Sequence, residues 1–560
     1  MMDSSRESSQ TREKAERDAP VVAEANSSSD DIAAKYDQAE KNYQPKSFKF
    51  WTILLGLYLA VFIVALDRTI IATAIPAITD EFHSLQDVGW YASSYMLTGA
   101  SSNLVFGKIY KYYSTKWSFL ASIFVFEVGS ALCGAAPNSV ALIVGRAIAG
   151  LGSSGIFSGG MMILVPLIPL RKRPIYYALF GIAFGVSSVL GPVLGGIFTD
   201  KATWRWCFYI NLPIGAITVL AVLFFLHIDS AHEHVSLKEK LVQLDPIGTF
   251  FLIPSVVSLI LALQWGGTTY AWSSAKVVGL LVCFAALFVL FWLVQIFIPR
   301  TATVKISIIT QRSMAAGVVF LFALTGSLFI IVYYLPIWFQ VVKGDSAVHS
   351  GISTLPLVLG LVVFSIVSGK ATQKVGYYVP FMIASPLMTA VGAGLLYTLA
   401  PDSNHEKWIG YQVLYGLGTG AAMQLPMLAV QAVLPAADIS SGMALMFFAQ
   451  QLGGAIFVAV GQNIFSSRVV SQLTGVPGLN AQQIVHLGAT QLRSVVPAQD
   501  LDVVIKAFNY GCTGTFLVAV GLSAATLLAA LGMEWKNINV TEKKDEKGGV
   551  ADVEAEMRVE

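Results

Sequence analysis

The chain has 560 residues, of which 55% are hydrophobic and 12% are charged, and its formal net charge is +2. In soluble proteins roughly a quarter of the residues are charged, so this composition excludes a soluble domain and predicts a chain that crosses a membrane many times. Because the net charge is so small, we expect no nucleic acid as a partner.

The first 47 residues are polar, rich in serine and mixed in charge. They contain no apolar core of the kind that a secretory signal needs, and we predict a disordered cytosolic tail. The four cysteines of the chain have no CxxC spacing, which indicates neither a metal site nor a disulfide framework. A bridge between Cys207 and Cys512 is the less favoured alternative.

A helix needs about 20 apolar residues to cross a bilayer, and fourteen stretches of the chain are predicted to do so. They are 50–72, 88–108, 117–136, 140–166, 175–198, 207–227, 246–265, 277–298, 315–338, 351–368, 379–400, 409–433, 442–465 and 511–533. The fold class that follows is an all-α polytopic membrane protein.

Lysine and arginine in short loops indicate the cytosolic side of a membrane protein. Here they follow the even-numbered spans, as at 171–173 after span four, although Lys201 and Arg205 after span five weaken the contrast. Both tails are therefore predicted to lie in the cytosol and the long segment 466–510 outside.

Three stretches of the first half recur in the same order in the second half, at offsets of 259 to 266 residues. The matching pairs are 107–117 with 369–379, 145–155 with 411–422, and 191–198 with 450–457. Two related bundles around a central cavity are the arrangement of many transporters.

These repeats predict the domain organisation. We expect one six-helix bundle at 48–228 and a second at 301–535, joined by a linker at 229–300 whose two spans match neither half. The tail at 1–47 and the tail at 536–560 are both assigned to the cytosol.

Four stretches carry a resemblance to a known family. They are LDRTIIATAIPAI at 66–78, GRAIAGLGSSG at 145–155, GVSSVLGPVLGGIF at 185–198 and WRWCFYINLPIG at 204–215. In this order, on fourteen predicted spans, they resemble the fourteen-span drug:proton antiporters of the major facilitator superfamily, and among these the fungal toxin-efflux pumps. The resemblance implies the major facilitator fold, a small-molecule substrate and exchange with H+. We expect a monomer in the lipid bilayer that needs no cofactor and no metal.

Two charged positions of the spans are candidates for proton coupling. Asp67 lies beside Arg68 in the first span, where a charge costs about 2.5 to 3.5 kcal/mol and usually faces protein or water. Asp67 is a candidate for carrying the proton, and a local structural pair with Arg68 is the alternative. In the resembling family the arginine that matches Arg146 is linked to proton coupling. A guanidinium stays charged, so we expect Arg146 to hold carbonyls or a carboxylate, or only to clamp two helices.

Glu127 stands in the middle of the third span, with no basic residue within one turn. Because an ionised carboxylate is costly to bury, Glu127 is the second candidate for the proton. The alternative is a protonated side chain that is bonded to a neighbouring helix.

The stretch GKIYKYYSTK at 107–116 departs from the pattern of the superfamily. An acidic residue is expected at its fifth position and a glycine at its eighth, but here these are Lys111 and Ser114. The missing acid argues against the usual charge-relay gate between the halves, and the sequence does not indicate which contacts replace it.

A cluster of small residues and one proline marks the fifth span. Its members are Gly185, Gly191, Pro192, Gly195 and Gly196. Small residues let helices approach closely in lipid, and a proline removes a backbone hydrogen bond and bends the helix. The resemblance identifies this stretch as the mark of antiporters and implies a hinge and seal between the bundle halves, while a static packing interface is the alternative.

The second half has few charges in its spans but many amides and aromatic side chains. Candidates for a substrate cavity are Asn211 of the first half and, in the second half, Tyr333, Trp338, Gln424, Gln450 and Gln451. Amides can bond a polar, uncharged ligand without burying an ion, and aromatic rings supply apolar walls. Ordinary helix packing is the alternative for each residue taken singly.

The function predicted from these features is proton-coupled export of a hydrophobic metabolite or drug by alternating access in the plasma membrane. The sequence contains no P-loop that would indicate ATP, and no nucleophile–base pair or metal motif that would indicate an enzyme. The alternatives are uptake of a siderophore or basic amino acid on the same scaffold, a vacuolar location, and a membrane sensor that does not transport.

Overall fold

The computed structural model describes most of the chain, from residue 39 to residue 538. The described ranges are 39–83, 87–227, 237–267, 270–435, 438–476 and 479–538, the last without 487–491, 493–495 and 498. Most of the tail at 1–47, which is predicted to be disordered, and most of the tail at 536–560 lie outside these residues. Cys133, Cys207, Cys283 and Cys512 are all free thiols.

The elements of the described residues are helices, and the long ones match the fourteen predicted spans one to one. They are α2 (Phe48–Phe82), α3 (Val88–Tyr112), α4 (Thr115–Gly134), α5 (Ser139–Leu167), α6 (Arg173–Lys201), α7 (Trp206–Tyr209) with α8 (Asn211–Phe225), α10 (Pro246–Trp265), α11 (Ala275–Phe297), α13 (Arg312–Trp338), α15 (Leu355–Val375), α16 (Val379–Tyr397), α17 (His405–Ala422) with α18 (Leu425–Val433), α19 (Ile439–Leu473) and α22 (Leu501–Leu531). Short helices join them: η2 (Leu170–Lys172), α9 (Leu237–Gln243), α12 (Ile306–Ile309), η3 (Phe339–Lys343), α14 (Ala347–Ser353) and α20 (Ala481–His486). The all-α fold predicted from the sequence is confirmed.

Thirteen of these helices are long and apolar enough to cross a membrane, and α3 is the exception among the fourteen. It is polar because it carries a run of serines and an asparagine that are buried against other helices. Ser154 of α5, for example, donates a hydrogen bond of 2.7 Å to Asn103 of α3. A polar helix fits inside a membrane protein when its polar side chains face neighbouring helices instead of lipid.

Helix ends reach further than the apolar runs suggest. α19 continues to Leu473 and α22 already begins at Leu501, so the segment between them is shorter than the expected 466–510. The extra turns contain charged side chains such as Arg468 and Lys506, which a search for apolar runs does not include.

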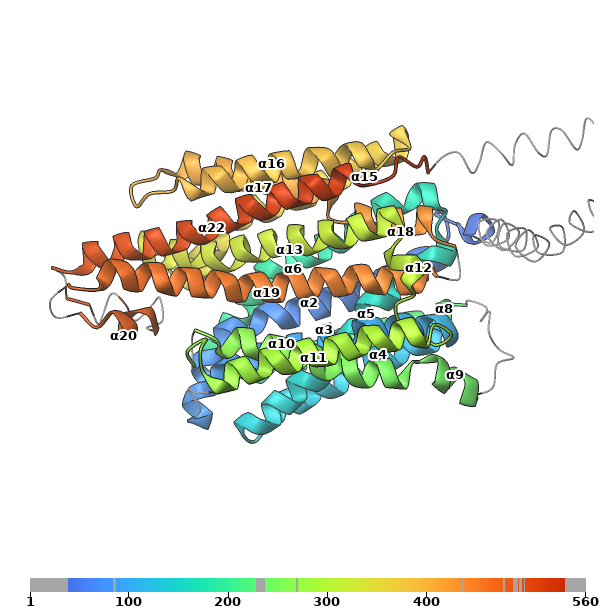
Figure 1. Cartoon of the computed structure of the whole chain (residues 1–560), viewed down its shortest axis with the longest axis horizontal. Coiled ribbons are helices and arrows are strands. Elements are labelled where there is room, and N and C mark those ends of the chain that lie inside the picture. Colours follow the sequence, from blue (N-terminus) through green and yellow to red (C-terminus); the bar gives the residue numbers. More distant parts are fainter. Residues whose placement is uncertain are drawn as a thin grey trace, which may run out of the picture.

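The long helices run side by side along one axis (Figure 1). The described chain begins at α2 and ends after α22 at the same end of the molecule, which we call the terminal end, and α20 lies at the opposite end, the α20 end. An even number of crossings brings the two chain ends together in this way.

The inserted helices α10 and α11 form an antiparallel pair on the outside of the molecule. α10 packs against α3 and α19, whereas α11 contacts mainly α10. Asp245 joins the pair at the terminal end, because its carboxylate accepts hydrogen bonds from the first turn of α10, from Gln295 of α11 and from Thr303. The insertion therefore adds a wall to the molecule without interrupting either half.

Glycines of the internal repeat have equivalent positions in the two halves. A Cβ atom at Gly150 of α5 would overlap the carbonyl oxygen of Tyr95 in α3, and one at Gly416 of α17 would overlap that of Leu357 in α15. Each of these two helices is packed between the two helices that precede it. The sequence repeat therefore reflects the same close contact of helix backbones in both halves, which only glycine allows.

This packing predicts the effect of adding a methyl group. We expect Gly150→Ala and Gly416→Ala each to destabilise the protein by about 1 to 3 kcal/mol, because the methyl group forces two helices apart. Gly394→Ala in α16 is the control, since no atom of the described chain lies within 4 Å of its Cβ position. Thermal unfolding of the purified protein in detergent measures the difference, and equal midpoints for Gly150→Ala and Gly394→Ala would contradict the packing.

Candidate functional site

Asp67 is the centre of a buried polar site in the first half of the chain. Its side chain is fully buried, and its Oδ2 atom forms an ion pair of 2.5 Å with Nη1 of Arg146 in α5. Its Oδ1 atom accepts a hydrogen bond of 3.2 Å from Nδ2 of Asn211 in α8. The structure therefore brings together three residues that the sequence analysis treated separately, and Asp67 pairs with Arg146 rather than with the adjacent Arg68.

Arg146 is held from several sides. It is 1% exposed, and its Nε atom donates a hydrogen bond of 2.8 Å to the carbonyl oxygen of Tyr91 in α3. Its guanidinium group lies 4.4 Å from the centre of the Tyr95 ring, at the distance of a cation–π contact. Because a guanidinium keeps its charge in proteins, this environment stabilises a permanent cation beside Asp67.

Glu127 lies close to this site, along the contact between α4 and α8. Asn211 also donates a hydrogen bond of 3.1 Å to Ser130, and Glu127 precedes Ser130 by one helical turn. One turn beyond Asn211, a Cβ atom at Gly215 would overlap the carboxylate of Glu127. Both carboxylate oxygens are buried and have no hydrogen-bond partner in the part of the chain that the structure describes.

The glycines of α6 hold this helix against α2 directly beside Asp67. A Cβ atom at Gly191 would overlap the hydroxyl of Thr69, and one at Gly195 would overlap that of Thr73. The Thr69 hydroxyl also donates a hydrogen bond of 3.0 Å to the carbonyl oxygen of Ser187. Gly191 and Gly195 therefore form a contact within the first half. The resemblance implied a contact between the two halves instead.

The other members of the cluster have different surroundings. A Cβ atom at Gly185 would lie 2.8 Å from Val358 of α15, so this glycine does face the second half. Gly196 has no neighbour within 4 Å of its Cβ position among the residues that the structure describes, and α6 continues as a helix through Pro192 to Lys201.

A cavity of about 280 Å³ lies between the two halves, among α2, α3, α10, α13 and α19. Tyr333 and Gln451, which the sequence analysis selected, both line it. So do Arg68, Ser93 and Gln264, which it did not select as cavity residues. Ser93 lies near the start of α3 and Gln264 near the end of α10, which places the cavity toward the α20 end.

The remaining cavity candidates are found elsewhere. Trp338 is fully buried and donates a hydrogen bond of 2.7 Å to Asn509 of α22. The carbonyl oxygen of Gln450 accepts a hydrogen bond of 3.0 Å from Thr325 of α13. Asn211 belongs to the Asp67 site.

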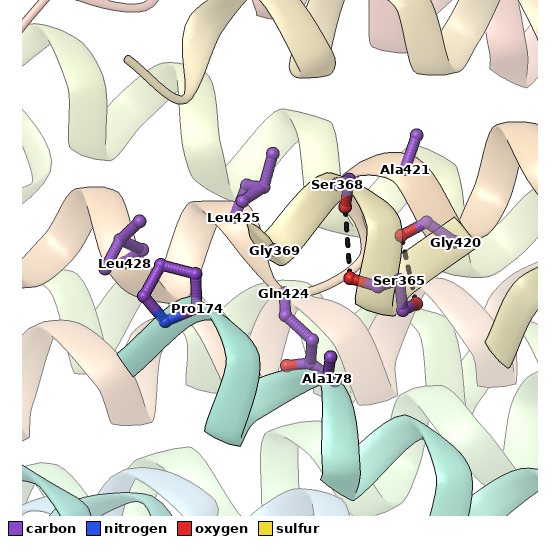
Figure 2. A pocket seen from close by; sticks show the side chains of 10 residues that line it. All are labelled: Pro174, Ala178, Ser365, Ser368, Gly369, Gly420, Ala421, Gln424, Leu425 and Leu428. Carbon is purple, nitrogen blue, oxygen red and sulfur yellow. Dashed lines mark hydrogen bonds between the residues drawn. The ribbon is translucent and has the colours of Figure 1, made fainter. Parts of the chain in front are cut away.

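Gln424 lines a separate crevice where α6, α15 and the start of α18 meet (Figure 2). Its side chain points toward Ala178 of α6, and Ser365 and Gly369 of α15 lie on the other side of the crevice. The crevice has a volume of about 10 Å³, which is room for about one water molecule. It is too small for a drug-sized ligand.

At the terminal end the two halves are joined by an ion-pair cluster, which we call the latch. Asp438, just before α19, forms ion pairs of 2.8 Å with Lys111 of α3 and 2.9 Å with Lys305. Gly107 of α3 packs against Ala444 of α19 beside it. The acid that is missing from the loop after the second span therefore has a counterpart in the other half of the chain.

The carboxyl group of Asp438 ionises more readily than that of a free aspartate. Burial of Asp438 opposes its ionisation, but hydrogen bonds from Lys111 and Lys305 outweigh this effect and hold the pKa of its carboxyl group below the usual range. A second contact between the halves lies nearby, where Arg173 at the start of α6 donates a hydrogen bond of 2.6 Å to Gln431 of α18. The terminal end is therefore closed by polar contacts, whereas the cavity lies toward the α20 end.

The sequence model of the Major Facilitator Superfamily matches residues 57–458, which is more than half of the chain. The chain belongs to this superfamily, and the resemblance found in the sequence is confirmed.

Close relatives in sequence are fungal proteins named as efflux pumps. The chain is 49% identical over 512 residues to the MFS-type efflux pump MFS1 of Trichophyton rubrum, an alignment that covers 90% of this chain and 96% of the relative. It is 46% identical over 507 residues to the efflux pump aflT of Aspergillus parasiticus, covering 90% and 98%. It is 47% identical over 493 residues to the efflux pump roqT of Penicillium rubens, covering 87% and 92%.

Solved structures confirm the fold. The proton:xylose symporter XylE, solved with 6-bromo-6-deoxy-D-glucose, matches with a TM-score of 0.55 and 13% identity, covering 88% of this chain and 98% of that one. The human organic anion transporter MFSD10 matches with a TM-score of 0.55 and 14% identity, covering 86% and 100%. At such low identity the two matches indicate the fold alone.

The ion pairs of the latch should hold the two halves together at the terminal end. We expect Asp438→Asn to remove about 1 kcal/mol of closing energy and to raise the population of molecules open at this end roughly fivefold. Spin labels at Tyr113 and Thr310 report the opening as a longer distance in pulsed electron paramagnetic resonance. Lys111→Met combined with Asp438→Asn should have less effect than the sum of the two changes, and full additivity would contradict the latch.

The same measurement tests the pH dependence of the latch. The pKa of Asp438 in the folded protein is lower than that of a free aspartate. The stabilisation that its ion pairs give to the closed terminal end is therefore fully present above the pKa of a free aspartate, and it is lost only as the pH falls through the lower pKa of the folded protein. The label distances should therefore stay constant between about pH 5 and about pH 8. Asp502→Asn, which removes an exposed ion pair with Lys506 in α22, is the control.

Proposed function

We propose that this protein exports hydrophobic small molecules, such as fungal secondary metabolites or drugs, in exchange for protons by alternating access. The observation that carries the proposal is the fully buried ion pair between Asp67 and Arg146. A titratable carboxylate between the helices of a membrane protein is a functional site by default, because its burial is costly. The relatives named as efflux pumps support the outward direction of transport.

Protonation of Asp67 changes the bonds that hold α2. As a carboxylate it accepts hydrogen bonds from Arg146 and Asn211, and as a neutral acid it loses the ion pair and becomes a donor. Arg146 keeps its contacts with Tyr91 and Tyr95 of α3, so it stays in place when Asp67 is released. The proton thus acts on the contact between α2 and α5.

Glu127 is the second proton site in this proposal. Its two buried oxygens have no hydrogen-bond partner among the described residues, so no contact there fixes it in the ionised form. Its position one turn from Ser130, which bonds the same asparagine as Asp67, lets the two carboxyl groups interact. Proton binding at one site therefore influences the other.

The conformer described here is the outward-facing one if the terminal end is the cytosolic end. Basic residues of the even-numbered loops, among them Lys111, Arg173 and Lys305, lie at this end, which supports that orientation. The latch then closes the cytosolic side, and the cavity lies toward the outside. An exporter in this state releases its substrate and binds protons. We place it in the plasma membrane, with the vacuolar membrane as the alternative.

Two other functions, uptake and sensing, differ from export in what they require of the protein. Uptake of a siderophore or a basic amino acid requires a site for its substrate. The positive charge of Arg68 in the cavity repels a cationic substrate. A membrane sensor would keep the fold and bind a ligand, but it would not move protons or ligand across the bilayer.

The Asp67 site predicts a specific loss of coupling. In proteoliposomes with an imposed pH gradient, we expect Asp67→Asn to reduce substrate-dependent proton movement at least about tenfold, because the variant cannot bind and release the proton. Exchange of labelled substrate without a gradient should continue, since it needs no net proton transfer. A pH-sensitive dye inside the vesicles measures the proton movement for a panel of aromatic compounds.

The control for this experiment is Glu81→Gln, which removes another carboxylate of α2. Glu81 forms an ion pair of 3.0 Å with Arg205 at the surface, with 48% of its side chain exposed. We expect this variant to move protons as the wild type does. Unchanged proton movement by Asp67→Asn at every pH would overturn the role of Asp67, and no movement by the wild type with any compound would favour a sensor.

Replacement of Pro192 is expected to impair transport rather than folding. It lies between Gly191 and Gly195, which hold α6 against α2, and it removes a hydrogen bond that would stiffen α6. We expect Pro192→Ala to slow export by about threefold to tenfold while the unfolding temperature changes little. Pro386→Ala inside α16 is the control, and an equal loss of folded protein and of export would contradict the hinge.

A further inference from the structure

Arg68 is a cation in the wall of the cavity, and it lacks an ion pair with any carboxylate that the structure describes. It follows Asp67 in the sequence, but successive residues of a helix point about 100° apart. Asp67 points toward Arg146, whereas Arg68 lines the cavity. Within the described residues, no carboxylate forms an ion pair with Arg68.

The hydrogen bonds of Arg68 are incomplete. A guanidinium group has five N–H donors, and Nη1 makes one long hydrogen bond of 3.4 Å to Oε1 of Gln451 in α19. Its Nε atom is buried without a partner in the described part of the chain. The Tyr95 ring lies 5.4 Å from the guanidinium carbon, which stabilises a cation only partly. A buried donor without an acceptor costs free energy, which a bound acceptor would recover.

The rest of the cavity is largely apolar. α10 contributes Ile260 and Leu263, α13 contributes Phe329 and Tyr333, and α19 contributes Val458. A volume of about 280 Å³ is close to the lower limit for sites of drug-sized ligands. The inserted helix α10 forms part of the wall, and its Gln264 is hydrogen-bonded to Ser93 of α3.

We propose that this cavity binds aromatic or otherwise apolar molecules that carry an acidic oxygen, such as a carboxylate, phenolate or enolate, with that oxygen on Arg68. A charge-assisted hydrogen bond to a guanidinium is among the strong ones, and the apolar walls accept the remainder of the molecule. Cationic compounds are excluded, because they would place two positive charges in one site of low dielectric constant. The proposal defines the substrate class of the transporter and rests on the proposed function for its relevance to export.

Binding to the full-length protein in detergent tests the proposal without requiring transport. The probes are 2-naphthylacetate, its methyl ester and 2-naphthylethylamine, which share one aromatic ring system and differ in charge. We expect the carboxylate to bind at least about tenfold more tightly than the ester, which corresponds to about 1.4 kcal/mol, and the ammonium compound not to bind. Isothermal titration calorimetry near neutral pH measures the three affinities.

Two variants assign the preference to Arg68. Arg68→Gln should bind the carboxylate and the ester equally. Gln451→Glu, which keeps Arg68 but places a carboxylate beside it, should also abolish the preference, so the proposal does not depend on one variant that fails to fold. Arg468→Gln is the control, because Arg468 lines a different groove, and it should keep the preference.

The outcomes separate this inference from the proposed function. Equal affinities of the wild type for carboxylate and ester, or an unchanged preference in both variants at Arg68 and Gln451, would overturn the assignment of an acidic ligand. A clear preference in the binding experiment without proton movement in vesicles would instead leave the binding site in place and overturn the exchange mechanism.

Discussion

The buried ion pair of Asp67 and Arg146 is the constraint around which the first half of the protein is organised. Neither charge can be left alone between apolar helices, because removing one partner of a buried pair costs several kcal/mol. The pair therefore fixes the register of α2 against α5, and Asn211 adds α8 to the same contact. Glycines complete the arrangement, since Gly191 lets α6 approach α2 beside Asp67 and Gly150 lets α5 approach α3.

The second half repeats this framework without its charges. Gln412 stands where the repeat places Arg146, and it donates a hydrogen bond of 3.0 Å to the carbonyl oxygen of Ser353. Thr325 bonds the backbone of α19 as Thr69 bonds that of α6, each at 3.0 Å. The proposed proton sites therefore lie in one half, while the cavity takes its walls from both.

The sequence predicts the spans well, because apolar runs and glycine repeats are local signals. It did not predict that Asp67 would face Arg146, because that pairing depends on the register of two helices far apart in the chain. The latch could not be predicted for a similar reason. The expected acid is missing at position 111 of the first half, and the acid that pairs with Lys111 is Asp438 of the second half, which only the folded chain brings close to it. Arg68 was considered only as a partner of Asp67, because a sequence does not show which side of a helix faces a cavity.

The proposed proton site at Asp67 and the proposed ligand site at Arg68 lie on two sides of one turn of α2, and this arrangement limits how they can be coupled. Protonation of Asp67 removes a negative charge, and the direct electrostatic effect would strengthen the hold of Arg68 on an acidic ligand. The proposed exchange with protons requires the opposite effect, so its coupling would have to come from movement of α2, which is joined to α6 by the hydrogen bond of Thr69. The membrane potential also contributes, because an anion that leaves a negative cytosol gains about 2.3 kcal/mol per 100 mV. In the proposed proton-coupled export, an acidic substrate would therefore need less energy from the proton gradient.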